Sequence, residues 1–416
     1  MRSPSLTRAA ACLWGAVVFM PVGLNYLGFL LLLVTMLLAG DLRERAVRLR
    51  AHPLWWPLVA LTLWQLLVLL LRPHYPETGQ NLAHGLRISL TVALALALRR
   101  DEAVWALRGF LAVTLFNLAY LIVFYTVLLQ FHVMPPMPDV LRPMIMLVGN
   151  KSINNALIFT IAGAAAAALG LALLRRRPAL ALAAFGLTGL VLLIINTNLP
   201  SRTSLLALLA VLPLLCVHQW RQRWRVLLAA LALGGAAVGV AAWNAPPQVR
   251  HLLAQGVQEL EAARHGAVSE GSWVVRYHMY TTTAQMVAEK PLLGWGIGAW
   301  NSEWRKRGPA LLADYNMPHN DYLWMGSQTG LPGALALLAL MLAGVWAAWK
   351  RTDLTGRMAF GAMLILLMAT GVNSALRDAQ IGLSLLWVAM LFLRMAGEPG
   401  RPWAEVLPRR WRPVSD

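Results

Sequence analysis

Residues 153–174 (INNALIFTIAGAAAAALGLALL) and 179–197 (ALALAAFGLTGLVLLIINT) are two apolar runs separated by Arg175, Arg176 and Arg177. Each run is long enough to cross a bilayer as an α-helix, which needs about 20 predominantly apolar residues. Lys and Arg are enriched in cytoplasmic loops, so the triplet predicts a cytoplasmic turn between two spans. This stretch therefore predicts an all-α membrane protein.

The same alternation of apolar runs and basic connections continues along the chain. About twelve runs are expected to span the membrane, at residues 9–22, 25–40, 54–71, 81–98, 103–130, 153–174, 179–197, 203–218, 226–243, 328–349, 357–375 and 380–396. Every second connection is rich in basic residues, namely 43–50, 99–100, 175–177, 221–225, 350–357 and the tail around 409–412. This alternation predicts that both termini are cytoplasmic.

The first run could be mistaken for a signal peptide, because Arg2 and Arg8 precede residues 9–22. No small-x-small cleavage site separates it from the run at 25–40. We therefore expect it to remain as the first span.

The composition excludes an ordinary soluble domain. Of the 416 residues, 58% are hydrophobic and only 13% are charged, whereas about 25% is usual for charged residues in soluble domains. The net charge of +18 does not indicate nucleic-acid binding, because the basic residues form short clusters in loops and no basic face. Such clusters are typical of loops beside anionic lipid headgroups. Cys12 and Cys216 lie in apolar runs and indicate neither a disulfide framework nor a metal site.

One connection is much longer than the others and is expected to face outward. The chain then divides into spans one to nine at 1–243, an external loop domain at 244–327, spans ten to twelve at 328–396 and a cytoplasmic tail at 397–416.

Two helices are expected within the external segment. In 247–264, apolar residues from Val249 to Leu260 recur on one helical face, which is typical of an amphipathic helix on a membrane or bundle surface. A second helix is expected at about 272–289, ending before Pro291, because the residue before proline disfavours helical geometry.

His319 is the first candidate for chemistry, in the stretch Met317-Pro318-His319-Asn320-Asp321-Tyr322 just before the tenth span. An imidazole with an ordinary pKa near 6.5 can accept and return a proton near neutral pH. A purely structural role, in which the ring caps a helix or bonds a carbonyl, is an equally good interpretation of the spacing.

Arg202 and Arg276 are candidates for binding an anion. Arg202 lies where the chain re-enters the membrane on the outer side, and Arg276 lies on the second external helix. A guanidinium is always charged and binds phosphate oxygens in pairs, so two of them would suit a diphosphate. The alternatives are snorkelling of Arg202 to the headgroups and a solvated helix face for Arg276.

Weaker substrate-binding candidates are Arg87, with His84 beside it in the fourth span, and Lys151 at the start of the sixth. An ionisable group at such depth is a functional hypothesis by default, although snorkelling explains these residues as well. Arg377 and Asp378 between the last two spans could form a simple ion pair.

Gly294, Gly296 and Gly298 do not predict a nucleotide site, because the spacing is GxGxG and no strand precedes it. We expect these glycines to let the backbone pack closely on the helix bundle. The sequence also contains no DxD, no HExxH and no histidine cluster, so it indicates no metal site.

The ordered set of Ser201-Arg202-Thr203, Arg276, Pro291–Gly298 and Pro318–Tyr322 resembles the O-antigen ligase family (WaaL type) and its Wzy-type polymerase relatives. The similarity extends to the architecture, with about a dozen spans and a long external loop that ends in a histidine. It implies a GT-C-like all-α fold in the bacterial inner membrane, with a helical periplasmic loop and an active site that faces the periplasm.

The resemblance also implies the reaction. It implies a metal-independent, inverting glycosyltransferase without a cofactor, which moves a glycan from undecaprenyl pyrophosphate to the outer core sugar of lipid A-core. His319 matches the family's essential histidine, and Arg202 and Arg276 match its two essential arginines. The expected partners are this donor, this acceptor and membrane lipids, with no nucleic acid.

Three other functions remain open from the sequence. A Wzy-type polymerase or a protein O-oligosaccharyltransferase would carry the same arginines and histidine. A lipid-linked glycan transporter is less favoured, because no pair of broken helices occupies equivalent positions in two halves and no buried acidic residues suggest ion coupling.

Overall fold

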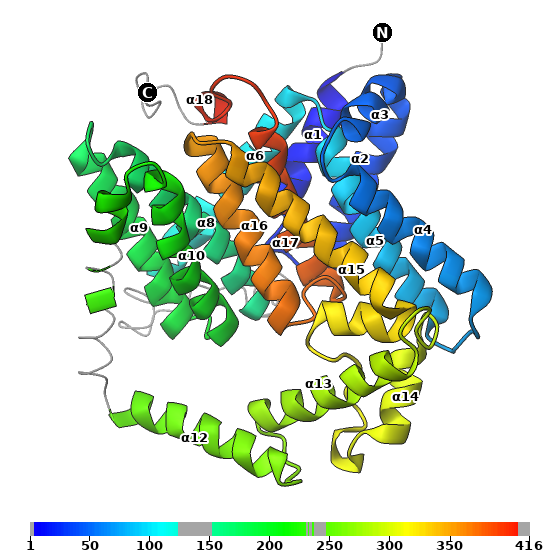
Figure 1. Cartoon of the computed structure of the whole chain (residues 1–416). Coiled ribbons are helices and arrows are strands. Elements are labelled where there is room, and N and C mark those ends of the chain that lie inside the picture. Colours follow the sequence, from blue (N-terminus) through cyan, green and yellow to red (C-terminus); the bar gives the residue numbers. More distant parts are fainter. Residues whose placement is uncertain (1–3, 124–151, 230–231, 233–234, 237–246, 407–416) are drawn as a thin grey trace, which may run out of the picture.

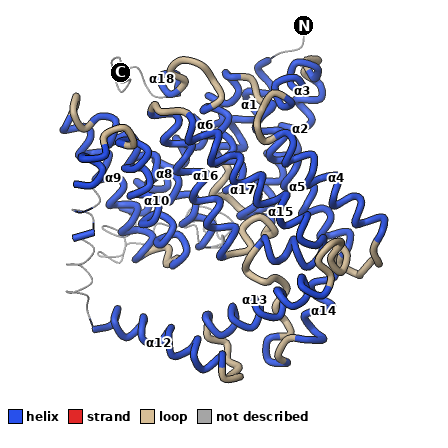
Figure 2. The backbone as a smooth tube through the Cα atoms, in the orientation of Figure 1, coloured by secondary structure: helices blue, strands red, loops and turns tan. Residues whose placement is uncertain are grey.

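The structure is a computed structural model that describes residues 4–123, 152–229, 232, 235–236 and 247–406 (Figure 1). Within these ranges the regular secondary structure is helical and no strand is present (Figure 2). The described part of the chain therefore has the all-α fold that the sequence predicts.

The helices before the external segment are α1 (Pro4–Ala16), α2 (Val22–Leu38), α3 (Leu42–Arg50), α4 (Trp55–Leu71), α5 (Thr78–Ala97), α6 (Arg100–Val123), α8 (Ser152–Leu173), α9 (Pro178–Thr197) and α10 (Arg202–Trp220). The later elements are α12 (Pro247–Arg264), α13 (Ser272–Glu289), α14 (Ala299–Arg307), the short 3-10 helix η2 (Ala310–Leu312), α15 (Asp321–Lys350), α16 (Leu354–Val372), α17 (Ala379–Ala396) and α18 (Trp403–Val406).

Seven of the described helices are long and apolar enough to cross a membrane, namely α6, α8, α9, α10, α15, α16 and α17. The pair α2 and α3, bent by 113°, would add an eighth, and α4 is a shorter apolar helix. Most of the expected spans thus coincide with helices, while 226–243 lies mostly outside the described residues. The number of twelve spans and their orientation stay predictions.

Burial separates central helices from peripheral ones. An apolar stretch of 18 residues in each helix can be compared by the share of its residues that is buried. This share is 83% in α17 and 78% in α8 and α16, but only 33% in α9 and α10. Figure 1 shows α16 and α17 in the middle of the molecule, with α8 to α10 on one side and α2 to α5 on the other. The partly exposed helices have apolar outer faces, as expected of helices that contact lipid.

The helices predicted at 247–264 and 272–289 are present as α12 and α13. Together with α14 they lie at one end of the bundle, opposite α3 and α18 (Figure 1). The short helices α3 and α14 are not anticipated by the sequence analysis, which treats both stretches as connections.

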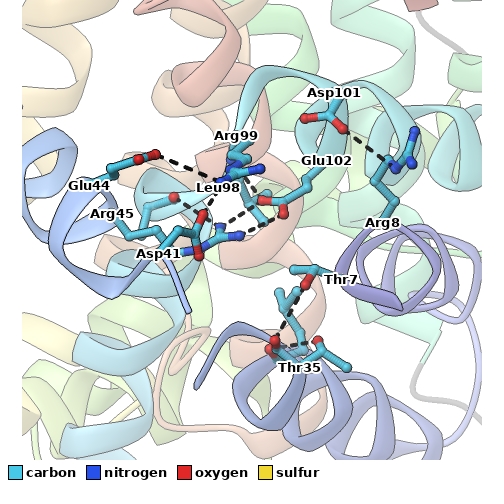
Figure 3. Close-up of polar contacts among 12 residues, drawn as sticks. Thr7, Arg8, Thr35, Asp41, Glu44, Arg45, Leu98, Arg99, Asp101 and Glu102 are labelled. Atoms are coloured by element: carbon cyan, nitrogen blue, oxygen red, sulfur yellow. Dashed lines mark hydrogen bonds and ion pairs between the residues drawn. The ribbon is translucent and has the colours of Figure 1, made fainter. Parts of the chain in front are cut away.

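A buried ion-pair cluster fixes α3 against the start of α6 (Figure 3). The Arg45 guanidinium donates to both carboxylate oxygens of Glu102 at 2.7 Å and to Asp41 at 2.7 Å. Arg99 pairs with the other Asp41 oxygen, also at 2.7 Å. Because Arg45 and Glu102 are only 3% and 1% exposed, these charges depend on one another for compensation.

Helix α15 is broken at Gly330, whose φ of 74° and ψ of −179° are not helical. The segment 291–298 runs against this break, where the Leu331 N–H donates to the Pro291 carbonyl at 2.7 Å and the Trp295 N–H to the Ser327 carbonyl at 2.9 Å. A Cβ atom on Gly330 would overlap the Leu292 carbonyl. The prediction that the glycine-rich stretch allows close backbone packing is confirmed, since a Cβ on Gly294 would overlap the backbone of Gln328.

Candidate functional site

His319 lies immediately before α15, in a strained backbone conformation. Its φ of 53° makes it the sole non-glycine residue with positive φ in the described ranges. Such a conformation is uncommon for a side-chain-bearing residue and persists only when its surroundings enforce it. The next residue, Asn320, is the N-cap of α15, because its side-chain oxygen accepts the Leu323 N–H at 3.0 Å.

Contacts with Tyr280, Asn373 and Tyr315 are among those that hold His319. The Tyr280 hydroxyl donates to the His319 carbonyl at 3.0 Å, and the His319 Nδ1 lies 3.4 Å from the Asn373 Oδ1. The Tyr315 ring lies edge-on to the imidazole, with the ring centroids 6.3 Å apart. The residue is partly buried.

The loop between α16 and α17 forms one wall of the site. Asp321, which is fully buried, accepts the backbone N–H groups of Leu376 at 2.8 Å and Arg377 at 3.1 Å. The Asn320 side chain donates to the Gly371 carbonyl at 2.7 Å. The residues that follow His319 therefore bind both the last turn of α16 and the loop after it.

Arg87 holds the same loop from α5. Its Nη2 donates to the carbonyls of Leu376, Arg377 and Asp378 at 2.7, 3.0 and 3.1 Å. Its Nη1 donates to the Tyr26 hydroxyl at 3.1 Å and lies 3.0 Å from the His84 Nδ1. With a 4% exposed side chain, Arg87 positions the loop, and direct binding of substrate by Arg87 stays a prediction.

Helix α13 carries the second part of the site. Ser272, Arg276 and Tyr280 are spaced by four residues and so lie along one face, about 6 Å apart along the axis. The Arg276 Nη1 donates to the Ser272 carbonyl at 3.3 Å. Burial raises the pKa of the Tyr280 phenol, which the Arg276 charge and a hydrogen bond with Asn320 oppose. Arg276 therefore lies one helical turn from the residue that contacts His319.

Arg202 opens α10 and is exposed. The Ser201 side chain caps this helix by accepting the Ser204 N–H at 3.2 Å. Arg202 lines a hollow of about 180 Å³ with residues of α12 and with the first turn of α13. The other lining residues are Gln255, Gly256, Glu259, Ser272 and Trp273.

The three principal candidates from the sequence are thus arranged along α13. Arg202 faces its first turn, Arg276 lies on its second, and His319 is bound to Tyr280 on its third. Of the weaker candidates, Arg87 lies behind the wall of the site, and Lys151 lies outside the described residues.

Sequence reasoning missed the residues that orient the histidine. Tyr280 and Asn373 are 39 and 54 positions from His319, and no motif links them to it. Asp321 belongs to the motif around His319, but its buried position and its backbone partners follow only from the packing. Among the described residues, no group of three or more His, Cys, Asp or Glu side chains could hold a metal ion.

This arrangement coincides with a match to a known family. Residues 188–338 match the family model described as O-antigen ligase. This part of the chain, which begins in α9 and ends in α15, is therefore similar to O-antigen ligases. The matched range includes Arg202, Arg276 and His319, whereas Arg87 and Asn373 lie outside it. No curated protein matches the chain.

The match over residues 188–338 confirms the resemblance to the O-antigen ligase family seen in the sequence. The family comprises membrane glycosyltransferase-like ligases and polymerases. Together with the long apolar helices, this match supports a multi-pass membrane protein that is similar to O-antigen ligases over residues 188–338.

Proposed function

We propose that the protein is an O-antigen ligase of the bacterial inner membrane. It transfers a glycan from undecaprenyl pyrophosphate to the outer core sugar of lipid A-core, on the periplasmic side. The observation that carries this proposal is the order of Arg202, Arg276 and Tyr280-bound His319 along successive turns of α13. Two cations followed by a base suit a diphosphate donor and a hydroxyl acceptor.

In the proposed reaction, Arg202 and Arg276 bind the oxygens of the donor diphosphate. The acceptor hydroxyl attacks the anomeric carbon, and its proton passes to the His319 ring. The new C–O bond forms as the bond from the anomeric carbon to the phosphate oxygen breaks, so the configuration inverts. The electron pair leaves on undecaprenyl pyrophosphate, where the two guanidinium groups stabilise the growing charge.

The test is transfer in liposomes that contain the purified full-length protein, undecaprenyl pyrophosphate-linked glycan and lipid A-core. His319→Ala is expected to abolish transfer, and Arg202→Ala and Arg276→Ala to lower the turnover about a hundredfold or more. His278→Ala on the same helix and Arg264→Ala at the exposed end of α12 are matched controls. Full transfer by a folded His319→Ala variant would refute the proposal.

The acceptor separates the ligase from related activities. A Wzy-type polymerase would extend a second lipid-linked glycan, and a protein O-oligosaccharyltransferase would modify a protein hydroxyl, with the same dependence on His319. A transporter would move the lipid-linked glycan across the bilayer without forming a new glycosidic bond. Each outcome is visible as a different labelled product.

A further inference from the structure

Asn373 is the residue that contacts the imidazole ring of His319 from the wall of the site. It directly follows α16 as its C-cap and is 8% exposed. Its Oδ1 accepts the Ser374 N–H at 3.0 Å and lies 3.4 Å from the His319 Nδ1. The same oxygen therefore serves both a backbone group and the imidazole.

The Ser374 contact determines which atom of the Asn373 amide faces His319. An amide nitrogen in that place would point its hydrogens at the Ser374 N–H, and two donors do not bond. Asn373 consequently presents an acceptor to the His319 Nδ1. Only a protonated Nδ1 can donate to it, which leaves the lone pair of the neutral ring on Nε2.

We propose that Asn373 is a positioning residue that holds His319 in the Nδ1–H tautomer, so that Nε2 is the atom that takes the proton of the acceptor hydroxyl. This inference rests on the proposed function for the role of the base, but the tautomer itself is independent of it. The 3.4 Å separation is long for a hydrogen bond in the resting enzyme, and such catalytic contacts tighten when substrate binds.

Several other ionisable groups lie on the elements that pack around His319, and each can influence its titration. They are Arg276 and Tyr280 on α13, Tyr315 in the preceding loop, Asp321 at the start of α15, Arg377 and Asp378 in the wall, and Arg87 with His84 on α5. Because a substitution at Asn373 leaves all of them in place, a change in titration between variants reports on Asn373.

The first experiment compares pH profiles of transfer for the wild type, Asn373→Asp and Asn373→Ala. Asp keeps an oxygen for Ser374 but adds a negative charge beside the ring, which favours the imidazolium. The acidic limb of the profile is expected to move up by about one pH unit or more, while Asn373→Ala loses at least tenfold in kcat with little change in KM. Asn301→Asp on α14 is the matched control and leaves the limb unchanged.

An acidic limb that stays the same in Asn373→Asp would overturn the proposal, since a merely structural residue would not alter the titration of His319. Recovery of activity by Asn373→Asp relative to Asn373→Ala supports it. Equal activity of wild type and Asn373→Ala would also overturn it.

The second experiment needs neither substrate nor a variant at Asn373. Nitrogen-15 spectra of the histidine-labelled full-length protein at pH above 7.5 distinguish a protonated Nδ1 from a protonated Nε2, and His319→Gln identifies the signal. A protonated Nδ1 supports the proposal, and a protonated Nε2 refutes it. If no acceptor supports transfer, the proposed function fails while this measurement still decides the tautomer.

Discussion

The Tyr280 hydroxyl donates to the backbone carbonyl of His319 at 3.0 Å. This bond connects α13, which carries Arg276, to a residue whose φ of 53° is unfavourable by itself. It thereby couples the predicted anion-binding face of α13 to the predicted base.

Tyr280→Phe tests this connection. The variant loses a hydrogen bond of about 1 kcal/mol, and His319 is then less firmly held in its strained conformation. We expect transfer in liposomes to fall about fivefold, mainly in kcat. Tyr277→Phe on the same helix is the control, and equal rates for both variants would contradict the expectation.

Gly330→Ala tests the break in α15. The added Cβ would overlap the Leu292 carbonyl, and alanine at φ 74° is itself strained, at a cost of about 1–3 kcal/mol before the overlap. The melting temperature in detergent should fall by several degrees. Gly189→Ala in α9 is the matched control because open space surrounds its Cβ position; an equal melting temperature for the two variants would show that the break is not required.

Glu102→Gln tests the buried cluster at the end of the bundle that carries α3. The variant leaves the Arg45 charge with Asp41 alone, and removal of one partner of a buried pair costs about 3–5 kcal/mol. The double variant Arg45→Met with Glu102→Leu removes both charges and should be more stable than Glu102→Gln. Chemical unfolding in detergent compares them, and a double variant that is the less stable of the two would contradict the expectation.

His52, between α3 and α4, predicts a dependence of stability on pH. Burial and then the charge of Arg394 lower its pKa from 6.5 to about 4, and its Nδ1 accepts the Leu54 N–H at 3.3 Å. The unfolded chain therefore binds more protons between these pH values, so stability falls as the pH drops from 6.5 towards 4. Between pH 7.5 and 4.5, the melting temperature of His52→Gln should fall by less than that of the wild type. An equal fall in both proteins would argue against this role.

Much of the helical architecture could be predicted from the sequence, because long apolar runs bounded by arginines or prolines allow few alternatives in lipid. The bounds of α12 and α13 follow from amphipathic spacing and from Pro291. Helix α3 was missed because its arginines resemble a loop, and only the buried partner Glu102, 57 positions from Arg45, explains how one of them lies inside the protein.

The sequence predicts several residues of the candidate site, but it does not predict how they are arranged or which residues hold them in place. Arg202, Arg276 and His319 stand out because their side chains can bind phosphate or accept a proton and because they lie in the motifs that resemble the O-antigen ligase family. Tyr280 and Asn373 are ordinary residues whose importance depends on long-range contacts. Arg87 has the chemistry of an anion-binding residue, yet three carbonyls of one loop occupy its Nη2.

The hydrogen bonds between Arg87 and the carbonyls of residues 376–378 also bear on when the site can form during synthesis of the chain. Arg87 precedes Leu376 by 289 residues. At a translation rate of about 5–20 residues per second, the carbonyls that Arg87 binds are synthesised ~15–60 s after Arg87 itself. Until the α16–α17 loop has emerged, the nascent protein lacks the wall that holds His319. A chain truncated before this loop would lack these contacts, and we expect it to be inactive.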